Sequence, residues 1–165
     1  MPEHTSGAGG APDVRAADVG AVPTPGAAVP SGAERGDAPI VGLVRRLYAA
    51  LGAGDEATLR ELLDPAFVGR FAEGMPHRLG GVREGADAAI RDGWWAIGAR
   101  FAVLAEPERW IVADDGATLT VLGTYRGRAR RGGPEVEAAF AHVWRAAGGR
   151  LVALDQVTDT VRWDG

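Results

Sequence analysis

The chain has 165 residues, a formal net charge of −4 and no cysteine. This length fits one domain with a short appendage. The absence of cysteine excludes disulfides, a thiolate nucleophile and cysteine-ligated metals, and the net negative charge argues against a general nucleic-acid binder. No apolar run approaches the roughly 20 residues of a membrane span. We therefore expect neither a nucleic-acid nor a membrane partner.

Residues 1–38 contain no Leu, Ile, Phe, Tyr or Trp and are dominated by Ala, Gly and Pro. Such a segment buries too little apolar area to offset its ordering entropy. We therefore expect a disordered N-terminal extension, followed by a folded domain at residues 39–165. Because the extension has neither the basic region nor the apolar stretch of a secretion signal, we expect a cytoplasmic protein.

Helical signals follow this extension. A first helix is predicted from Asp37, a capping residue, to Gly52 and Gly54, since apolar residues recur at helical spacing between them. Asp55 then suits the start of a second, short helix that ends before Pro65. Both helices carry apolar residues on one face and are expected to cover a core.

The middle of the chain is less regular. Residues 67–71 have the composition of a short strand, and the glycine-rich residues 72–85 predict an irregular loop. A third helix is expected over residues 86–99, because its apolar residues again recur at helical spacing.

The rest of the chain has the pattern of consecutive strands. These are expected at residues 100–105, 109–113, 118–130, 136–145 and 151–161. Helices followed by antiparallel strands indicate an α+β fold, in which a curved antiparallel sheet is wrapped by about three N-terminal helices. Such a sheet and its helices form a cone with an internal pocket, and a cone of this size holds a small organic molecule.

The last two strands predict a hairpin with a defined register. The Gly148-Gly149 pair tolerates the positive φ angles of a tight turn. The register that fits this turn places His142 beside Gln156, whereas a slip of one residue would pair His142 with Asp155. A lone imidazole on an apolar strand face is the most informative chemical feature of the sequence.

Two stretches resemble a known family. Residues 44–55 (VRRLYAALGAGD) resemble the opening helix and turn of the nuclear transport factor 2-like superfamily, and residues 140–159 resemble its final hairpin. Within this superfamily the chain is most similar to the SnoaL-like group, which includes polyketide cyclases. The resemblance covers about residues 38–163. It implies a cone-shaped fold with a pocket for an apolar small molecule.

The resemblance bears differently on individual positions. SnoaL-type cyclases carry a pocket histidine and, further along the hairpin, an aspartate that acts as base. His142 matches the histidine, but Gln156 stands at the later position, and an amide takes up no proton at neutral pH. Ketosteroid isomerases, of the same superfamily, have a carboxylic acid at the position of His142 and an oxyanion-binding tyrosine at that of Leu47, one residue before Tyr48.

We predict His142, Gln156 and Asp159 as catalytic candidates. His142 suits either proton transfer near neutral pH or hydrogen-bond donation to an oxyanion, the alternative being a core histidine bonded to a neighbouring group. Gln156 either orients the substrate or forms a polar pocket wall. Asp155 and Asp159 are expected on the outer face of the sheet, paired with arginines, unless a bulge turns Asp159 toward the pocket mouth.

Aromatic side chains and their neighbours supply the candidate pocket wall. The substrate-binding candidates are Tyr48, Phe71, His77, Trp94, Trp95, Trp110, Phe140, Trp144, Leu154 and Thr158. Most of the aromatic side chains suit the core equally well. His77 lies in the loop where a lid is expected. Because only His77 and His142 lie inside the domain, no histidine-rich metal site is expected.

The sequence and the resemblance together favour an enzyme without a cofactor that cyclises or isomerises an apolar, polyketide-like carbonyl compound. The first alternative is a non-catalytic ligand-binding or dimerisation module with the same pocket. A further alternative, water addition to an epoxide, requires Asp155 and Asp159 to face inward. We also expect a homodimer through the outer sheet face, where these aspartates and Arg126 offer opposite charges.

Overall fold

A computed structural model of the protein describes residues 38–164. The expected disordered extension and the expected Asp37 cap lie outside these residues. The described residues contain the helical elements α1 (Pro39–Ala53), α2 (Glu56–Leu62), η2 (Pro76–Arg78), α3 (Ala86–Ala88), η3 (Ala89–Trp95), α4 (Ala96–Arg100) and α5 (Val161–Asp164). The strands are β1 (Leu63–Phe71), β2 (Gly81–Glu84), β3 (Phe101–Val112), β4 (Thr118–Ala129), β5 (Glu135–Ala147) and β6 (Arg150–Thr158).

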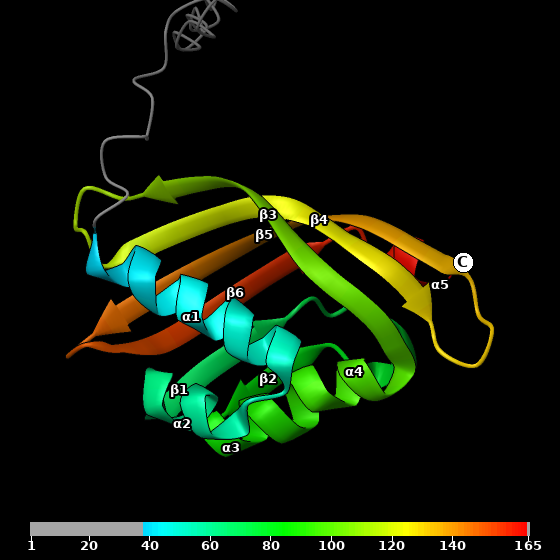
Figure 1. Cartoon of the computed structure of the whole chain (residues 1–165), viewed down its shortest axis with the longest axis horizontal. Helices are drawn as coiled ribbons and strands as arrows, with labels where there is room; N and C mark the ends of the chain where they lie inside the picture. The colour runs from blue at the N-terminus through cyan, green and yellow to red at the C-terminus, as the bar shows by residue number, and fades with distance from the viewer. Residues whose placement is uncertain (1–37, 165) are drawn as a thin grey trace, which may run out of the picture. The chain divides into compact units, whose positions relative to one another are not determined.

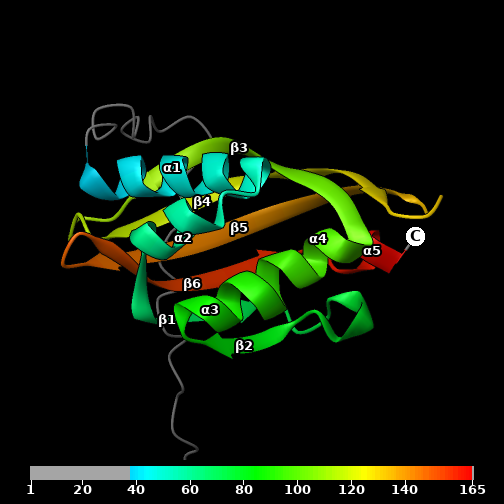
Figure 2. The ribbon, with the colours of Figure 1, turned by 60° about the horizontal axis from the view of Figure 1, so that its bottom comes forward.

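The strands form one curved, unclosed sheet with the order β2-β1-β6-β5-β4-β3. All neighbouring strands are antiparallel except β1 and β6, which are parallel. The helices α1, α2 and the continuous helix α3–η3–α4 lie on the same side of the sheet (Figures 1 and 2). The predicted α+β cone is therefore confirmed.

The end of the first helix and the start of the second agree with the sequence, whereas the second helix ends at Leu62 because Leu63 already begins β1. Gly54 follows α1 in the left-handed conformation, with a φ angle of 70°, which glycine adopts without a steric penalty. The carboxylate of Asp55 then accepts a hydrogen bond from the Thr58 backbone N–H at 3.1 Å and caps α2. One face of α1 is buried against the sheet, through Ile40, Val41, Val44, Leu47 and Ala50.

The third predicted helix is confirmed and contains a π-helical segment. It runs without a break through α3, η3 and α4, and η3 is the π-helical part. Such wide turns are rare and occur often at functional sites. Trp94 and Trp95 both lie in η3, on the side of the helix that faces the interior of the cone.

Three further expectations were wrong in detail. Residues 81–84, expected in a loop, form the edge strand β2, which pairs with β1. The two strands expected at residues 100–113 are one strand, β3, with a bulge between Pro107 and Arg109. The last strand ends at Thr158 instead of residue 161, because Val161 already begins the short helix α5.

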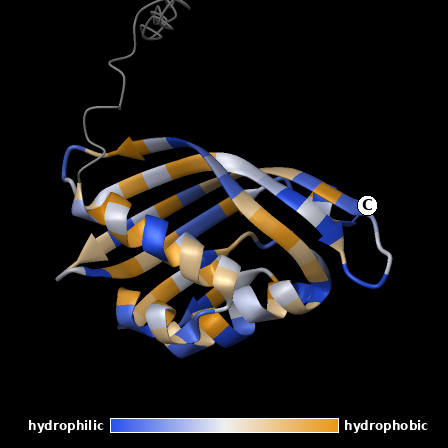
Figure 3. Ribbon diagram, in the orientation of Figure 1, coloured by the Kyte–Doolittle hydropathy of each residue, from blue (hydrophilic) through white to orange (hydrophobic). Residues whose placement is uncertain are grey.

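The register of the final hairpin is confirmed, with His142 directly opposite Gln156. Polar and apolar residues alternate along the strands (Figure 3), so one set of side chains faces the helices and the other faces outward. His142 and Gln156 belong to the inner set, and only about 4% and 6% of their surfaces are exposed.

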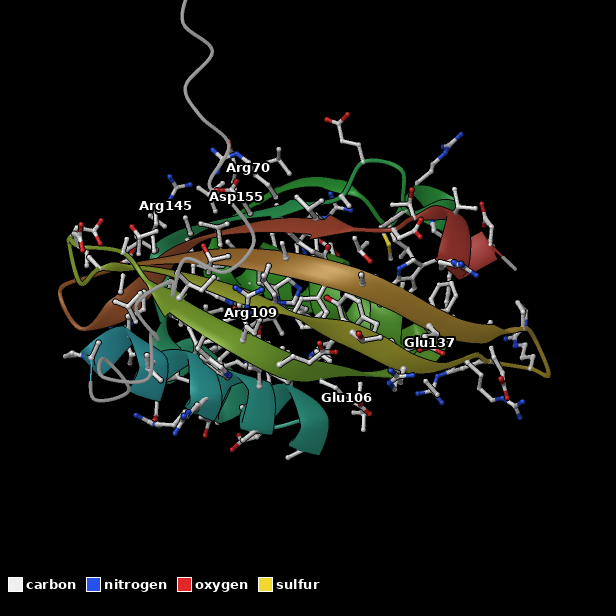
Figure 4. All side chains as sticks on the ribbon, turned by 90° about the horizontal axis from the view of Figure 1, so that it is seen from above. Arg70, Glu106, Arg109, Glu137, Arg145 and Asp155 are labelled. Carbon is white, nitrogen blue, oxygen red and sulfur yellow. The ribbon has the colours of Figure 1, made fainter. Side chains whose placement is uncertain are left out.

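The outer face of the sheet carries two groups of paired charges (Figure 4). In the first, which we call the Asp155 cluster, the Asp155 carboxylate lies 2.6 Å from Arg145 and 3.4 Å from Arg70. In the second, the Arg126 cluster, the guanidinium lies 2.6 Å from Glu137 and 3.2 Å from Glu106. The expected outward position of Asp155 is confirmed.

Candidate functional site

A cavity of about 170 Å³ lies between the inner face of the sheet and the helices. Its lining residues are mostly aromatic and aliphatic, and none of them carries a side-chain carboxylate, ammonium or guanidinium group. They are Tyr48, Leu51, Gly52, Trp94, Trp95, Ile97, Gly98, Phe101, Val103, Leu104, Ala105, Tyr125, His142, Trp144, Gln156 and Trp163. The cavity is close in size to a dry protein cavity of about 150 Å³ that binds benzene.

His142 forms the centre of the polar part of this wall. It projects inward from β5, while Tyr48 approaches from α1 and Tyr125 from the adjacent strand β4. The Tyr48 hydroxyl lies 2.7 Å from Nδ1 of His142, and the Tyr125 hydroxyl lies 2.7 Å from Nε2. Both ring nitrogens are therefore hydrogen-bonded to tyrosines, and we call this group the Tyr–His–Tyr triad.

Two further donors orient the tyrosines. The amide Nε2 of Gln156 donates to the Tyr125 hydroxyl at 2.7 Å, and the indole N–H of Trp144 donates to the Tyr48 hydroxyl at 3.4 Å. The Gln156 carbonyl accepts from the backbone N–H of Ala72 at 3.4 Å. Among the described residues, every buried side-chain nitrogen or oxygen has a partner.

Burial keeps the triad uncharged near neutral pH. It lowers the pKa of His142 to about 3, because an imidazolium ion would lose its hydration there. Burial likewise raises the pKa of the Tyr48 and Tyr125 hydroxyls well above the usual range, with smaller opposing effects from Trp144 and Gln156. The triad therefore offers neutral hydrogen-bond donors and acceptors.

Tryptophans build the apolar wall on either side of the triad. The Trp94 and Trp144 rings are stacked with their centroids 6.4 Å apart, which links η3 to β5. Trp95 is fixed by its indole N–H, which donates to the Glu56 carboxylate at 3.1 Å. This bond and the ion pair with Arg60 lower the pKa of Glu56.

The cavity includes some of the predicted binding residues and excludes others. Tyr48, Trp94, Trp95 and Trp144 line it, as do His142 and Gln156. The remaining candidates do not line it and lie nearby in the core or at the surface. These are Phe71, His77, Trp110, Phe140, Leu154 and Thr158.

The residues outside the cavity have identifiable packing roles. Phe140 stacks on His142, with centroids 4.2 Å apart, and supports the ring from behind. Phe71 packs against Trp94, and Trp110 packs against Tyr48. His77 is exposed, and its ring centroid lies 6.3 Å from that of Phe101.

Asp159 lies away from the cavity. It follows the end of β6, and its half-exposed carboxylate lies 3.7 Å from Arg162. The side chain of Thr158 donates to the Ala139 carbonyl at 2.9 Å and accepts from the Trp163 indole at 3.2 Å. Neither Asp155, in β6, nor Asp159, which follows β6, is turned toward the interior by a bulge.

Among the lining residues that sequence reasoning missed are Tyr125, a member of the triad, and Trp163, which packs against it. Tyr125 alternates with Leu119, Val121 and Gly123 on the inner face of β4, so the period-two pattern places it inward but does not distinguish it from a core residue. Trp163 belongs to α5, a single turn, and packs edge-on against Tyr125 with centroids 5.0 Å apart.

The described residues contain no group of three or more His, Asp or Glu side chains placed to hold a metal ion. None of the helices within residues 38–164 is long and apolar enough to cross a membrane.

The curved sheet and its helices form an α+β cone, which encloses an apolar cavity with a buried polar triad. A family model of the SnoaL-like domain matches residues 44–154. The chain therefore belongs to the SnoaL-like family, within the nuclear transport factor 2-like (NTF2-like) superfamily.

Individual relatives agree with this assignment. The uncharacterised protein Rv0034 of Mycobacterium tuberculosis is 32% identical over 117 residues, which span 69% of this chain and 84% of the relative. An NTF2-like protein of unknown function from Burkholderia pseudomallei has a TM-score of 0.67 at 30% identity, over 74% of this chain and 92% of that one. A candidate SnoaL-like polyketide cyclase from Jannaschia sp. shares the fold, with a TM-score of 0.63 at 20% identity over 74% and 87%.

Proposed function

We propose that the protein is an enzyme that shifts protons within a small, apolar, cyclic carbonyl compound, as in isomerisation or cyclisation, without a cofactor. The observation that carries this proposal is the uncharged Tyr–His–Tyr triad in the wall of an apolar cavity. Hydrogen bonds from fixed donors stabilise a developing enolate oxygen most strongly where water is excluded. The likeness to a candidate polyketide cyclase supports the same class of chemistry.

In this proposal the tyrosines, rather than His142, contact the carbonyl oxygen. Both nitrogens of His142 already have tyrosine partners, and the lowered pKa of the ring keeps it uncharged near neutral pH, so it cannot act as an imidazolium acid. Tyr48 and Tyr125 each present a hydroxyl beside the cavity, and His142 and Gln156 hold these hydroxyls in place. His142 and Gln156 therefore act through the tyrosines.

The cavity limits the enclosed part of the substrate to about one ring. Its volume of about 170 Å³ is near that of a benzene-binding cavity. A polycyclic compound would place one ring against the triad, and its other rings would extend beyond the cavity.

A test of the proposal uses cyclohex-3-en-1-one, a one-ring ketone that isomerises to the conjugated cyclohex-2-en-1-one with a change in ultraviolet absorbance. We expect the protein to accelerate this conversion, and we expect Tyr48→Phe/Tyr125→Phe to lose about 10²-fold or more of the acceleration, the usual scale for acid–base groups. His77→Gln, which changes an exposed residue outside the cavity, is the matched control. A wild-type rate equal to that of buffer, at saturating ketone, would contradict the proposal.

A non-catalytic binding module is the second candidate, and one observation favours it. None of the cavity-lining residues is a carboxylate, so the base expected at Gln156 is missing from the described site. This candidate predicts that the ketone quenches tryptophan fluorescence but is not converted. Water addition to an epoxide is not supported, because Asp155 and Asp159 both lie outside the cavity.

We also propose that the protein forms a homodimer through the outer sheet face. The Asp155 cluster has two arginines and one aspartate, hence a net charge of +1, and the Arg126 cluster has two glutamates and one arginine, hence −1. A twofold axis between them would bring each cluster against the opposite cluster of the second copy, as an isologous interface requires. The apolar row Leu122, Ala141 and Val157 lies across neighbouring strands of this face.

A further inference from the structure

The hydrogen bonds of the Tyr–His–Tyr triad fix how many protons it can offer to a ligand. Trp144 and Gln156 occupy one acceptor site on each tyrosine oxygen, since an indole N–H and an amide NH₂ only donate. A neutral imidazole has one N–H and one acceptor nitrogen. The ring must therefore donate to one of the two tyrosines and accept a hydrogen bond from the other.

This leaves two arrangements of equal hydrogen-bond count. In the first, Nδ1–H of His142 donates to Tyr48, and the Tyr125 hydroxyl donates to Nε2, so the Tyr48 proton is free for a ligand. In the second, Nε2–H donates to Tyr125, and the Tyr48 hydroxyl donates to Nδ1, so the Tyr125 proton is free. In either arrangement one hydroxyl proton has no partner within the triad.

From this geometry we infer that the triad is a neutral proton relay, in which tautomer exchange of His142 moves one available proton between Tyr48 and Tyr125. This inference rests on the proposed function and deepens it, because it supplies proton transfer without the missing carboxylate. Tyr125, which lies at the buried end of the triad, becomes the group that accepts the substrate proton.

The forward pass starts from the first arrangement and is balanced in protons. Tyr48 gives its proton to the carbonyl oxygen, and Nδ1 of His142 gives its proton to the Tyr48 oxygen. Tyr125 gives its proton to Nε2, and the Tyr125 oxygen receives a proton from the α-carbon of the ketone. The C–H electron pair becomes the enol double bond. The ketone becomes a neutral enol, and the triad ends in the second arrangement.

The reverse pass closes the cycle. Tyr125 delivers its proton to the γ-carbon of a dienol, and Nε2 gives its proton back to the Tyr125 oxygen. Tyr48 gives its proton to Nδ1, and the enol hydroxyl returns its proton to the Tyr48 oxygen. The product is the conjugated enone and the triad regains its first arrangement. The relay therefore requires the carbon that loses the proton and the carbon that receives it to lie on the same ring, as they do in the test compound cyclohex-3-en-1-one.

The decisive experiment measures the ¹⁵N chemical shifts of the ring nitrogens of His142 in the ligand-free protein at pH 7. These shifts distinguish a protonated from an unprotonated nitrogen. The chain has three histidines, and comparison with His142→Gln assigns the signals. In the wild type we expect a neutral ring with both nitrogens between the two limiting values, because both tautomers are populated.

The two tyrosine variants should shift the ring in opposite directions. In Tyr48→Phe the hydroxyl partner of Nδ1 is lost and the Tyr125 hydroxyl remains to accept from Nε2, which favours an unprotonated Nδ1 and a proton on Nε2. In Tyr125→Phe the hydroxyl partner of Nε2 is lost and the Tyr48 hydroxyl remains to accept from Nδ1, which favours a proton on Nδ1. Phenylalanine keeps the ring packing, and two-dimensional amide spectra check the fold of each variant.

In the wild type, a ring locked in one tautomer or a charged ring would overturn the relay. The same tautomer in both tyrosine variants would also overturn it.

With cyclohex-3-en-1-one, a relay also predicts that each single Phe variant loses as much rate as the double variant, since groups that act as a unit are not additive. Independent losses that multiply would contradict it. If both tautomers of His142 are populated but cyclohex-3-en-1-one is not converted, the result would instead count against the proposed function.

Discussion

The ring of Phe71 occupies the space that a Cβ atom on Gly93 would need. Such an atom would lie 2.5 Å from the ring carbon Cζ, a distance that real Cβ contacts do not show. Gly93 belongs to the π-helical segment η3, so its missing side chain lets this helix approach β1 closely. The approach also sets the position of the next residue, Trp94, which packs edge-on against Phe71.

We expect Gly93→Ala to lower the free energy of unfolding by about 1–3 kcal/mol, the usual cost of overpacking a core. The matched control is Gly42→Ala in α1, where a Cβ atom meets nothing within 4 Å. That change should stabilise the protein by up to about 1 kcal/mol, because alanine favours helix more than glycine. Urea unfolding measures the stability of both variants. Equal stabilities would refute the close approach of Gly93 to the Phe71 ring.

The burial of His142 predicts a pH dependence of stability. The pKa of this residue is lowered from 6.5 to about 3 in the folded protein, so the unfolded chain takes up a proton between these values that the folded chain does not. The contribution of His142 to stability is therefore complete above about pH 6.5 and is lost as the pH falls toward 3. In this range the free energy of unfolding falls by about 1.4 kcal/mol for each pH unit of acidification.

His142→Gln provides the comparison, since glutamine does not titrate. Between pH 6.5 and 5 the wild type should lose about 2 kcal/mol more of its unfolding free energy than this variant. Denaturant unfolding at several pH values measures the difference. Parallel curves for the two proteins would show that the imidazole is protonated equally in the folded and unfolded states.

The proposed homodimer predicts that a charge at the centre of the outer face separates the subunits. Val157 is 63% exposed on β6 and lies beside Ala141. Val157→Asp should yield a monomer in sedimentation or light-scattering experiments while leaving the fold intact. Val161→Asp changes an equally apolar residue that is 80% exposed in α5 and should remain dimeric. A monomeric wild type at micromolar concentration would disprove the assembly.

Removal of residues 1–37 tests the expectation drawn from their composition. Because this segment has no Leu, Ile, Phe, Tyr or Trp, we expect its deletion to leave the melting temperature within a few degrees of the full chain. Calorimetry of the two proteins measures this. A larger drop would show that the extension stabilises the domain.

Local sequence signals were sufficient for the elements whose partners are close in the chain. The Gly148-Gly149 turn fixed the hairpin register, and with it the inward position of His142 and Gln156. Edge strand β2 escaped prediction because its pairing with β1 depends on a tertiary contact, and its glycine-rich surroundings resemble a loop.

The chemistry of the site depends on contacts that no local pattern reveals. Tyr48 and His142 are 94 positions apart, and their hydrogen bond exists only because α1 crosses β5. The pKa of His142 follows from burial in the assembled core. The sequence therefore locates the imidazole but not its partners or its charge.

The unclosed sheet has two free edges, and each carries a feature that hinders addition of a further strand. The edge strand β2 is only four residues long, and short edges offer few unpaired N–H and C=O groups. The long edge strand β3 contains Pro107, which has no N–H, next to the bulge that precedes Arg109. Chains that assemble through sheet edges form fibrils and aggregates. The two edges of this domain thus oppose aggregation by the addition of strands.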